Sequence, residues 1–467
     1  MGGFFGTISR TDCVNDLYYG TDYNSHLGTR RGGMAVYDGH EFRRSIHNIE
    51  NSYFRTKFEP ELGSFSGHSG IGVISDTESQ PIMVQSHLGR FGIVTVSKIN
   101  NLGELAEEML QKNRHFSEVS ERGINPSELV AMLICEEESF EKGIELVYEK
   151  VKGSCSLLLL TEGGIFAARD KLGRTTVILG KKDGAYALSS ETTSFPNLGF
   201  EVERYLGPGE ILFVTPEGYE QRKKPNDKMQ VCAFLWVYYG YPSSFYEGIN
   251  VEECRYRCGA AIAKKDKVEV DFVAGVPDSG VAHAIGYSNI KHIPYKRAFV
   301  KYTPTWPRSF MPQNQEMRDL VARMKLVPVP SIINGKKLAL CDDSIVRGTQ
   351  LKDNVNVLYS GGASEVHVRP ACPVLIFPCM FLNFSSSRSS LDLAGRKAIL
   401  ELEGAEDRFL DEYATPGTDR NLAMIEKIRQ RINSTTLSYQ ELDDLIEAIG
   451  LPKEKVCTHC WDGTSYF

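Results

Sequence analysis

The stretch LALCDDSIVRGTQL, residues 338–351, decides the fold class of this chain. Its apolar beginning and the adjacent carboxylates Asp342 and Asp343 are typical of a strand that ends at the carboxyl edge of a parallel sheet, where α/β folds bind their ligands. The residues that follow predict an amphipathic helix with Thr349 at its N-cap. A short loop containing Gly348 before this helix directs backbone N–H groups and the positive end of the helix dipole at one point. The stretch therefore predicts a site for a phosphate monoester.

The two aspartates indicate the other half of the ligand. Carboxylates do not bind phosphate directly, so Asp342 and Asp343 are expected to hold ribose hydroxyls or Mg²⁺. Together with the phosphate site, they predict a phosphorylated sugar as the ligand. An acidic turn that only caps a helix is the alternative for a bare pair of aspartates.

The rest of the chain divides into two parts. From about residue 250 onward, strand-like segments such as VEVDFVAGV alternate with helix-like ones, which predicts a parallel sheet of βα units. Earlier residues carry short β-like runs and a helical stretch over residues 102–111, which predicts an α+β domain. The polar segment QRKKPNDK, residues 221–228, lies between the parts, so we expect domains over residues 1–228 and 229–467. Helices are predicted for the C-terminal end, one with a capping box of Ser438 and Glu441.

Composition and charge exclude several classes of protein. The 467 residues are 42% hydrophobic and 24% charged, as in an ordinary globular protein of two or three domains. The formal net charge of −7 disfavours nucleic acid and anionic membrane as partners. No apolar run approaches the ~20 residues that cross a bilayer, and no secretion signal opens the chain, so we expect a cytoplasmic protein. The 11 cysteines favour free thiols or metal ligands over a disulfide framework.

The string DDSIVRGT resembles the 5-phosphoribosyl-1-diphosphate (PRPP) motif of type I phosphoribosyltransferases, and in this form that of the amidophosphoribosyltransferase family. The segment GVPDSGVA, residues 275–282, is similar to the diphosphate loop of this family. The resemblance implies an α/β phosphoribosyltransferase domain with a parallel sheet. The residues that it places around PRPP are Pro277, Asp278, Ser279, Gly280, Asp342, Asp343, Ser344, Ile345, Val346, Arg347, Gly348 and Thr349.

The same resemblance implies a magnesium ion and a cationic loop. Ser279 would hold Mg²⁺ together with Asp342 and Asp343. Lys301 and Arg308 match cations of a family segment that closes over PRPP. Displacement of diphosphate builds positive charge on the sugar and negative charge on the leaving group, which Mg²⁺ and these cations would stabilise.

The first domain resembles a class II glutamine amidotransferase, an α+β sandwich of the N-terminal nucleophile hydrolases. The similarity rests on GGFFGTIS, residues 2–9, HLGTRRGGMA, residues 26–35, and YALSSET, residues 186–192. The catalytic Cys of the family falls on Gly2, and a glycine offers no side-chain nucleophile. Other family positions also differ. The resemblance aligns the glutamine-binding Arg of the family with Ser75, and its oxyanion Asn and Gly with Ile99 and Asn100. An Asp of the family aligns with Pro126. We expect a domain without glutaminase activity.

The cysteines suggest a cluster site. Cys457 and Cys460 form CTHC, and this spacing can chelate a metal. Some members of the family hold a [4Fe–4S] cluster with such a pair and two further cysteines, which match Cys232 and Cys379. The resemblance therefore implies an iron–sulfur cluster on these four residues, with Zn²⁺ or unligated thiols as alternatives.

The expected function is the transfer of ammonia to PRPP, giving phosphoribosylamine and diphosphate in purine biosynthesis, with ammonia that is free or supplied by another protein. The resemblance also implies a homo-oligomer. Two alternatives stay open: a PRPP-binding regulatory or scaffolding protein with little turnover, and a transferase with a different amine or base as acceptor. The first is encouraged by one departure: the family segment ARPDS reads GYPSS here, residues 240–244, so an Arg and an Asp are lost near the acceptor channel.

Overall fold

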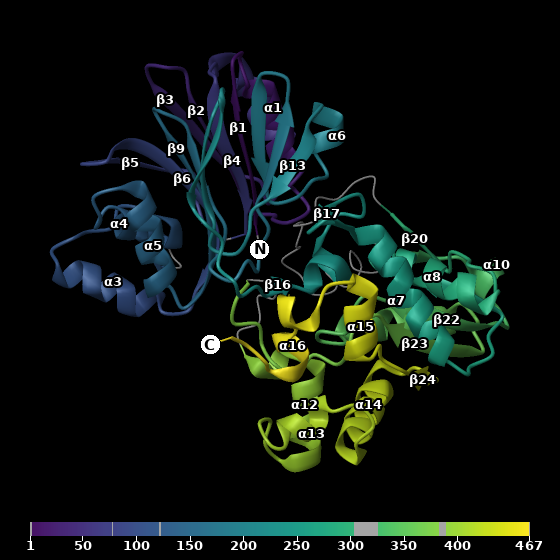
Figure 1. The fold of residues 1–467 in the computed structure, drawn as a ribbon. Helices are drawn as coiled ribbons and strands as arrows, with labels where there is room; N and C mark the ends of the chain where they lie inside the picture. Colours follow the sequence, from purple (N-terminus) through teal and green to yellow (C-terminus); the bar gives the residue numbers. More distant parts are fainter. Residues whose placement is uncertain (1, 77, 121–122, 303–325, 383–388, 467) are drawn as a thin grey trace.

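The computed structural model describes residues 2–76, 78–120, 123–302, 326–382 and 389–466. The first half of the chain forms two antiparallel sheets that face each other (Figure 1). In spatial order, the strands of the first sheet are β13 (Glu201–Tyr205), β11 (Ile178–Lys182), β12 (Ala185–Ser189), β1 (Gly3–Ser9), β4 (Ser69–Ser75), β2 (Arg31–Tyr37) and β3 (Phe42–Asn48). Those of the second are β15 (Gly218–Lys223), β14 (Ile211–Thr215), β10 (Ile165–Ala168), β9 (Gly153–Thr161), β6 (Gly89–Ile99) and β5 (Ile82–Ser86).

Strand β9 shows why both faces of its sheet are buried. Side chains alternate across a strand, so Leu158 and Leu160 join the buried cluster between the sheets, whereas Leu157 and Leu159 join a cluster with helices on the outer face. These helices are α3 (Leu102–Gln111), α4 (Pro126–Ile134) and α5 (Phe140–Lys150). Helices α1 (Val14–Asp22) and α2 (Phe54–Phe58) cover the outer face of the first sheet.

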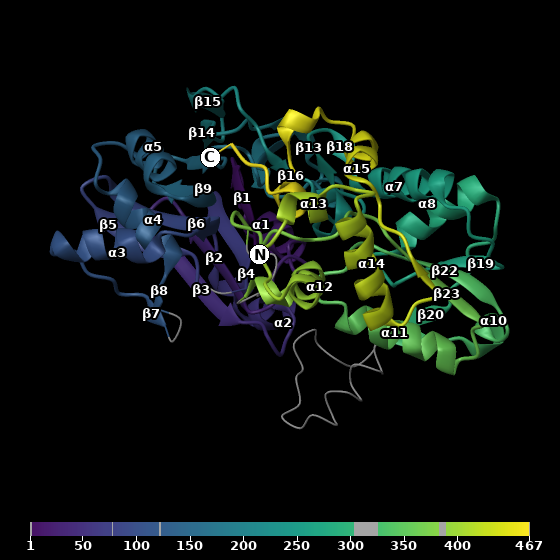
Figure 2. The ribbon, with the colours of Figure 1, turned by 90° about the horizontal axis from the view of Figure 1, so that it is seen from below.

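The second half is built on a parallel sheet with helices on both faces. The sheet order is β19 (Phe272–Gly275), β22 (Lys337–Asp342), β23 (Glu365–Pro370) and β24 (Thr436–Leu437). Val273, Ala339 and Cys341 pack on the side of α7 (Val251–Lys265) and α15 (Leu442–Ile449). Phe272, Leu338 and Leu340 pack on the side of α11 (Thr349–Ser360), α12 (Ala394–Glu403) and α14 (Asp419–Ile432), as both views show (Figures 1 and 2).

Shorter elements connect these layers. Strands β16 (Val231–Cys232) and β25 (Val456–Cys457) pair in parallel, and a π-helical turn, η2 (Leu235–Tyr239), follows β16. The others are η1 (Glu59–Ser64), β7 (Val119–Ser120), β8 (Gly123–Ile124), α6 (Phe195–Leu198), β17 (Phe245–Tyr246), β18 (Ile249–Asn250), α8 (Val281–Lys291), β20 (Phe299–Lys301), β21 (Leu326–Pro328), α10 (Pro330–Ile333), η3 (Ser390–Asp392), α13 (Leu410–Ala414), η4 (Lys453–Lys455) and α16 (His459–Asp462). Among the described residues, the structure contains no helix of the length and apolarity that a bilayer crossing requires.

The predicted fold class, an α+β sandwich followed by a parallel α/β sheet, is confirmed. The domain boundary at residue 228 stays a prediction; β15 ends at Lys223 and β16 begins at Val231. The predicted capping box at Ser438 is wrong. Strand β24 pairs with β23, and the Ser438 amide donates to the carbonyl oxygen of Val368, so helix α15 starts only after Glu441.

Candidate active site

The predicted phosphate loop leaves the end of β22 and enters helix α11. The N-cap of α11 is Gly348, with φ of 78°, and Thr349 is the first helical residue, so the predicted N-cap at Thr349 is wrong by one position. A left-handed backbone at this turn favours glycine, which carries no Cβ. The buried face of α11 includes Leu351, Val355 and Leu358, as its amphipathic pattern predicts. The helix therefore presents its N-terminus to the loop that the aspartates begin.

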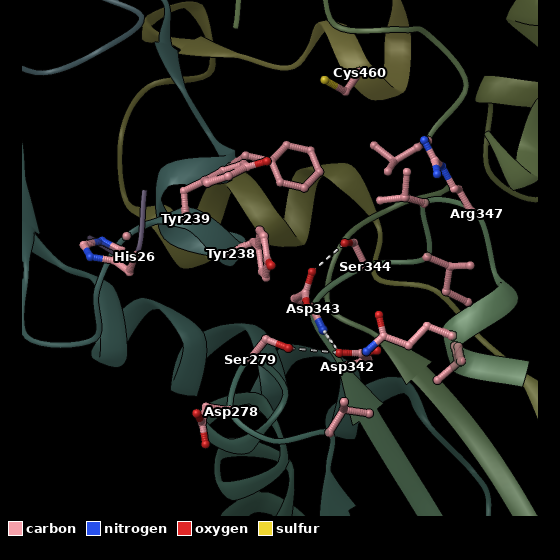
Figure 3. Close-up of a pocket in the computed structure, with 18 of the residues that line it drawn as sticks. His26, Tyr238, Tyr239, Asp278, Ser279, Asp342, Asp343, Ser344, Arg347 and Cys460 are labelled. Atoms are coloured by element: carbon pink, nitrogen blue, oxygen red, sulfur yellow. Dashed lines mark hydrogen bonds between the residues drawn. The ribbon is translucent and has the colours of Figure 1, made fainter. Parts of the chain in front are cut away.

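Asp342 and Asp343 form a buried carboxylate pair at the end of β22. Asp342 Oδ1 accepts hydrogen bonds from the Asp343 amide at 2.9 Å and from Ser279 Oγ at 3.2 Å, and Ser344 Oγ donates to Asp343 (Figure 3). Burial, and secondarily the charge of Asp343, raise the pKa of Asp342 well above its usual value. Because burying two adjacent negative charges costs free energy, this carboxylate pair favours a cation between or beside it.

The predicted diphosphate loop leaves β19, the neighbour of β22. Gly275 pairs with Cys341, so both loops emerge at the same edge of the parallel sheet. A Cβ on Gly280 would collide with the carbonyl oxygen of Cys341, which explains a glycine at this close approach. Lys301 Nζ in β20 lies 2.6 Å from Asp278 Oδ2, so one predicted cation reaches the loop. Arg308 lies outside the described residues.

One cavity of about 840 Å³ joins the two loops to the first half of the chain. Pro277, Asp278, Ser279 and residues 342–349 line it, so the structure brings together all the predicted PRPP residues except Gly280, which packs behind them. Their binding of PRPP stays a prediction. From the first half, His26, Leu27, Gly28, Thr29 and Asp76 line the same cavity.

Gly2, the predicted position of the family nucleophile, lies close to strand β4. A Cβ built on Gly2 would lie 2.5 Å from the carbonyl oxygen of Ile74, well inside van der Waals contact. Cys13 is 1% exposed, and burial raises the pKa of its thiol far above the usual value, which disfavours a thiolate nucleophile there. Ser75 Oγ donates to Glu78 at 2.9 Å, and Pro126 opens helix α4.

The segment at the predicted oxyanion position contacts the second domain instead of a ligand site. Asn100 Nδ2 donates to the carbonyl oxygen of Met380 at 2.6 Å. The ammonium of Lys98 donates to the carbonyl oxygen of Cys379. Ile99, between them, ends strand β6 and packs beside the buried cluster under α3. This segment therefore ties the first half to the chain around Cys379.

The four predicted cluster cysteines come from three segments that lie close together. Cys232 and Cys457 are register partners in the β16 and β25 pair. Cys379 and Cys460 form a thiol hydrogen bond. This bond lowers the pKa of Cys379 to about 6, and its effect is larger than that of burial, which raises the pKa. Both residues also line the cavity. Among the described residues, however, no three or more His, Cys, Asp or Glu side chains are arranged to hold a metal ion.

Sequence reasoning missed a polar network between the two halves. Glu191, which is 2% exposed, accepts from Tyr246 Oη at 2.6 Å and from Ser244 Oγ at 3.0 Å. Its Oε1 also lies 2.9 Å from Nε2 of His26. The buried Arg169 guanidinium pairs with Glu247 at 2.7 Å. These residues carry no local sequence signal, because the partners in each pair are distant from one another in the chain.

Comparisons with known proteins agree with this architecture. Residues 69–197 match a family described as a glutamine amidotransferase domain. The chain is 29% identical to the amidophosphoribosyltransferase of Methanothermobacter thermautotrophicus, over 99% of this chain and 93% of that protein. It is 28% identical to the Bacillus subtilis amidophosphoribosyltransferase, over 96% of this chain and 89% of that protein.

Solved structures give the same result for the fold. Glutamine PRPP amidotransferase from B. subtilis, in complex with ADP and GMP, superposes with a TM-score of 0.85 and 27% identity, covering 99% of this chain and 97% of that chain. A second structure, described as the allosteric regulatory enzyme of purine biosynthesis, has a TM-score of 0.84 and 26% identity, covering 99% and 96%. Through both halves, this chain is similar to the amidophosphoribosyltransferases, with a glutamine amidotransferase fold followed by a phosphoribosyltransferase fold.

Proposed function

We propose that this protein transfers ammonia to PRPP, giving phosphoribosylamine and diphosphate in purine biosynthesis, and that it does not hydrolyse glutamine itself. One observation carries the first part. The loops that begin at Pro277 and Asp342 leave adjacent parallel strands and line a single cavity. The names of full-length relatives support the same reaction class.

Each part of PRPP has a matching group in the cavity. The backbone N–H groups before α11 suit the 5-phosphate, because the positive end of the helix dipole points there. Asp342 and Asp343 suit the ribose hydroxyls and a cation. The loop from Pro277 to Gly280 suits the diphosphate, with Lys301 at its rim and Arg308 expected to join it.

The donor set at the sheet edge fits Mg²⁺. Two carboxylates and the Ser279 hydroxyl are hard oxygen ligands, and the raised pKa of Asp342 reflects the cost of burying its charge beside a second carboxylate. A bound Mg²⁺ would neutralise charge on the leaving diphosphate. Asp342 and Asp343 would orient the sugar, and Lys301 would stabilise the departing oxygens.

The loss of glutaminase activity is supported by the first domain. Glutamine hydrolysis in this fold needs a side-chain nucleophile at the N-terminus, and Gly2 has none and no space for one. The segment that would supply an oxyanion hole is engaged with the Cys379 segment through Lys98 and Asn100. The nitrogen donor would therefore be free ammonia or ammonia from another protein.

We also propose a [4Fe–4S] cluster on Cys232, Cys379, Cys457 and Cys460. Four buried or half-buried thiols from three segments are the donors that such a cluster prefers. Zn²⁺ is the alternative occupant, with free thiols as the third state. A cluster here would be structural, because it would join the two ends of the second domain. We further place the domain boundary near residue 228 and expect homo-oligomers.

One experiment tests the function. Purified protein with PRPP and MgCl₂ is assayed for diphosphate release with ammonium chloride or glutamine as nitrogen donor. Ammonium-dependent and not glutamine-dependent release supports the proposal. Calorimetric PRPP binding without release under either donor would instead select a regulatory protein, an alternative favoured by the loss of the family Arg and Asp in residues 240–244.

A further inference from the structure

A buried arginine of the first domain reaches the four-cysteine site. Arg174 lies in the connection between β10 and β11 and is 1% exposed. Its guanidinium lies 3.5 Å from the centre of the Phe381 ring, close after Cys379 in the chain. It also forms a side-chain hydrogen bond with Cys457, and its positive charge lies near enough to act on both Cys457 and Cys232. One side chain therefore reaches all three segments that carry the predicted ligands.

Hydrogen bonds hold this arginine in place. Arg174 Nη2 donates to Gln230 Oε1 at 3.2 Å and to Ser465 Oγ at 3.4 Å. The carbonyl oxygen of Arg174 accepts from the Cys232 amide at 3.1 Å, so the arginine backbone is tied directly to strand β16. A side chain that is fixed at several points loses little conformational entropy when it engages a charged partner. The orientation of the guanidinium toward the cysteines is therefore set before any metal binds.

A second cation of the first domain lies at the same site. The ammonium of Lys98, near the end of β6, donates to the carbonyl oxygen of Cys379, and its positive charge acts on that residue. Lys98 is half-buried, whereas Arg174 is buried. The first domain therefore brings two positive charges to a site whose cysteines all belong to the second domain.

A metal centre on four cysteines needs such charges. Cysteine binds metals as the thiolate, so four of these ligands leave Zn²⁺ or an iron–sulfur core with a net negative charge. Burial of this charge costs free energy unless a cation or an N–H donor lies close to the sulfurs. A guanidinium that forms a hydrogen bond with a ligand sulfur supplies both, and partners of this kind orient metal ligands and tune the metal.

We infer that Arg174, together with Lys98, positions the four cysteines and compensates the negative charge of the metal–thiolate centre that they form. The inference rests on the proposed cluster and not on the proposed transfer of ammonia. The first domain, which we propose to lack glutaminase activity, would then be needed for the metal centre of the second domain. Net charge and hydrogen bonds to the sulfurs set the reduction potential of an iron–sulfur cluster. Loss of the arginine charge disfavours the more negative, reduced state and so lowers this potential.

The test measures the metal content and the reduction potential of the full-length protein after purification without oxygen. In Arg174→Gln, the ratio of reduced to oxidised cluster at a fixed potential should fall about tenfold, which for a one-electron couple is a shift of about 59 mV to lower potential. Arg174→Lys keeps the positive charge and should recover part of this shift. A loss of packing alone would lower the stability of both variants without this dependence on charge.

Lys98→Gln is the second variant, and it keeps the inference testable if Arg174→Gln does not fold. Lys98 is half-buried, and its replacement leaves the buried core unchanged. The potential should shift in the same direction as in Arg174→Gln. The shift should be smaller, because Lys98 donates to a backbone carbonyl and not to a sulfur.

Arg222→Gln is the matched control. The guanidinium of Arg222 in β15 also lies near a phenylalanine ring, 5.3 Å from the centre of that of Phe213. It pairs with Glu141 and Glu220. The reduction potential of this variant should equal that of the unchanged protein.

Zinc in place of iron changes the readout but not the test. The rate at which a chelator removes zinc should then rise about tenfold in Arg174→Gln, because loss of a partner of a metal ligand weakens metal binding. A potential, or a rate of zinc loss, that is unchanged in both Arg174→Gln and Lys98→Gln overturns the inference and leaves the metal site standing. Protein with neither iron nor zinc rejects the cluster and the inference together. Ammonium-dependent diphosphate release by that protein would still support the proposed function.

Discussion

Asn100 donates its side-chain amide to the carbonyl oxygen of Met380 across 2.6 Å, so the end of strand β6 is tied to the chain that carries Cys379. Lys98 makes the neighbouring contact, to the carbonyl oxygen of Cys379 itself. In the resembling family, this segment supplies the oxyanion hole of the glutaminase. Here Lys98 and Asn100 contact the chain around Cys379, so this part of the first half supports the cysteine segment.

Removal of this support should weaken the cysteine site. Lys98→Ala with Asn100→Ala deletes two hydrogen bonds to backbone carbonyls, each worth about 1 kcal/mol, more for the charged lysine. We expect a lower unfolding midpoint and a faster loss of visible cluster absorbance in air after anaerobic purification. Lys152→Ala, at an exposed lysine whose side chain is paired with Glu104, is the control. Unchanged absorbance decay in the double variant would contradict the support role.

Restoring the family nucleophile should not restore glutaminase activity. Gly2→Cys would place a Cβ 2.5 Å from the carbonyl oxygen of Ile74, so β1 or β4 must shift. We expect no glutamine hydrolysis and a loss of stability of about 1–3 kcal/mol, the usual cost of overpacking. Glutamate formation and thermal unfolding are the measurements.

Gly103→Cys is the control for this change, because a Cβ at Gly103 meets no atom within 4 Å. Its stability should stay close to that of the unchanged protein. Measurable glutamate formation by Gly2→Cys would mean that the rest of the glutaminase site is intact, and the first domain would then be a hydrolase that lacks only its nucleophile.

Asp342→Asn should separate activity from stability. The carboxylate is buried and its pKa is raised by burial and by Asp343, so in the absence of a cation its charge destabilises the fold. We expect PRPP-dependent diphosphate release to fall by about 100-fold or more, because a cation and ribose ligand is lost. The unfolding midpoint without Mg²⁺ should stay level or rise.

Asp353→Asn, exposed on helix α11, is the matched control and should change neither quantity. Full activity of Asp342→Asn would mean that the sugar does not bind at Asp342. Loss of activity that is explained by unfolding alone would mean that the Asp342 carboxylate has a structural role only.

His283 should make stability fall in mild acid. It is fully buried on α8, and burial, followed by the charge of Arg255, lowers the pKa of His283 from 6.5 to about 3. Above pH 6.5 both folded and unfolded states hold it neutral; below, only the unfolded state takes up the proton, so its stability contribution is lost as pH falls toward 3. Between pH 6.5 and 5 the loss is about 2 kcal/mol.

The check compares unfolding midpoints at pH 7.5 and 5.0. His283→Gln cannot titrate and should show a smaller drop than the unchanged protein. His40→Gln, at an exposed histidine, should keep the full drop. Equal drops in all three proteins would mean that His283 does not carry this pH dependence.

Local patterns predicted the elements well. The helix predicted over residues 102–111 has the same bounds as α3, and the apolar run before Asp342 is strand β22 in a parallel sheet. These succeed because side-chain periodicity and burial act within a few residues. The helix start predicted at Ser438 is wrong because strand β24 next to it pairs with β23, which is distant in the chain. The N-cap predicted at Thr349 is wrong because Gly348 adopts a left-handed backbone and caps the helix itself.

The candidate site was only half visible in the sequence. The PRPP loops are contiguous strings, so their residues could be named in advance. The other end of the cavity is lined by His26, Asp76, Tyr238 and Tyr241, and Glu191 lies against His26; these residues meet only through the packing of the two halves. No local sequence pattern predicts these contacts, because the residues that form them are far apart in the chain.

The proposed function depends on one claim, that the chain has a working PRPP site and no glutaminase activity of its own. Diphosphate release from PRPP and Mg²⁺, measured in parallel with ammonium and with glutamine, separates the two outcomes. We expect release with ammonium and none above background with glutamine. Glutamine-driven release by the purified chain alone would contradict the claim.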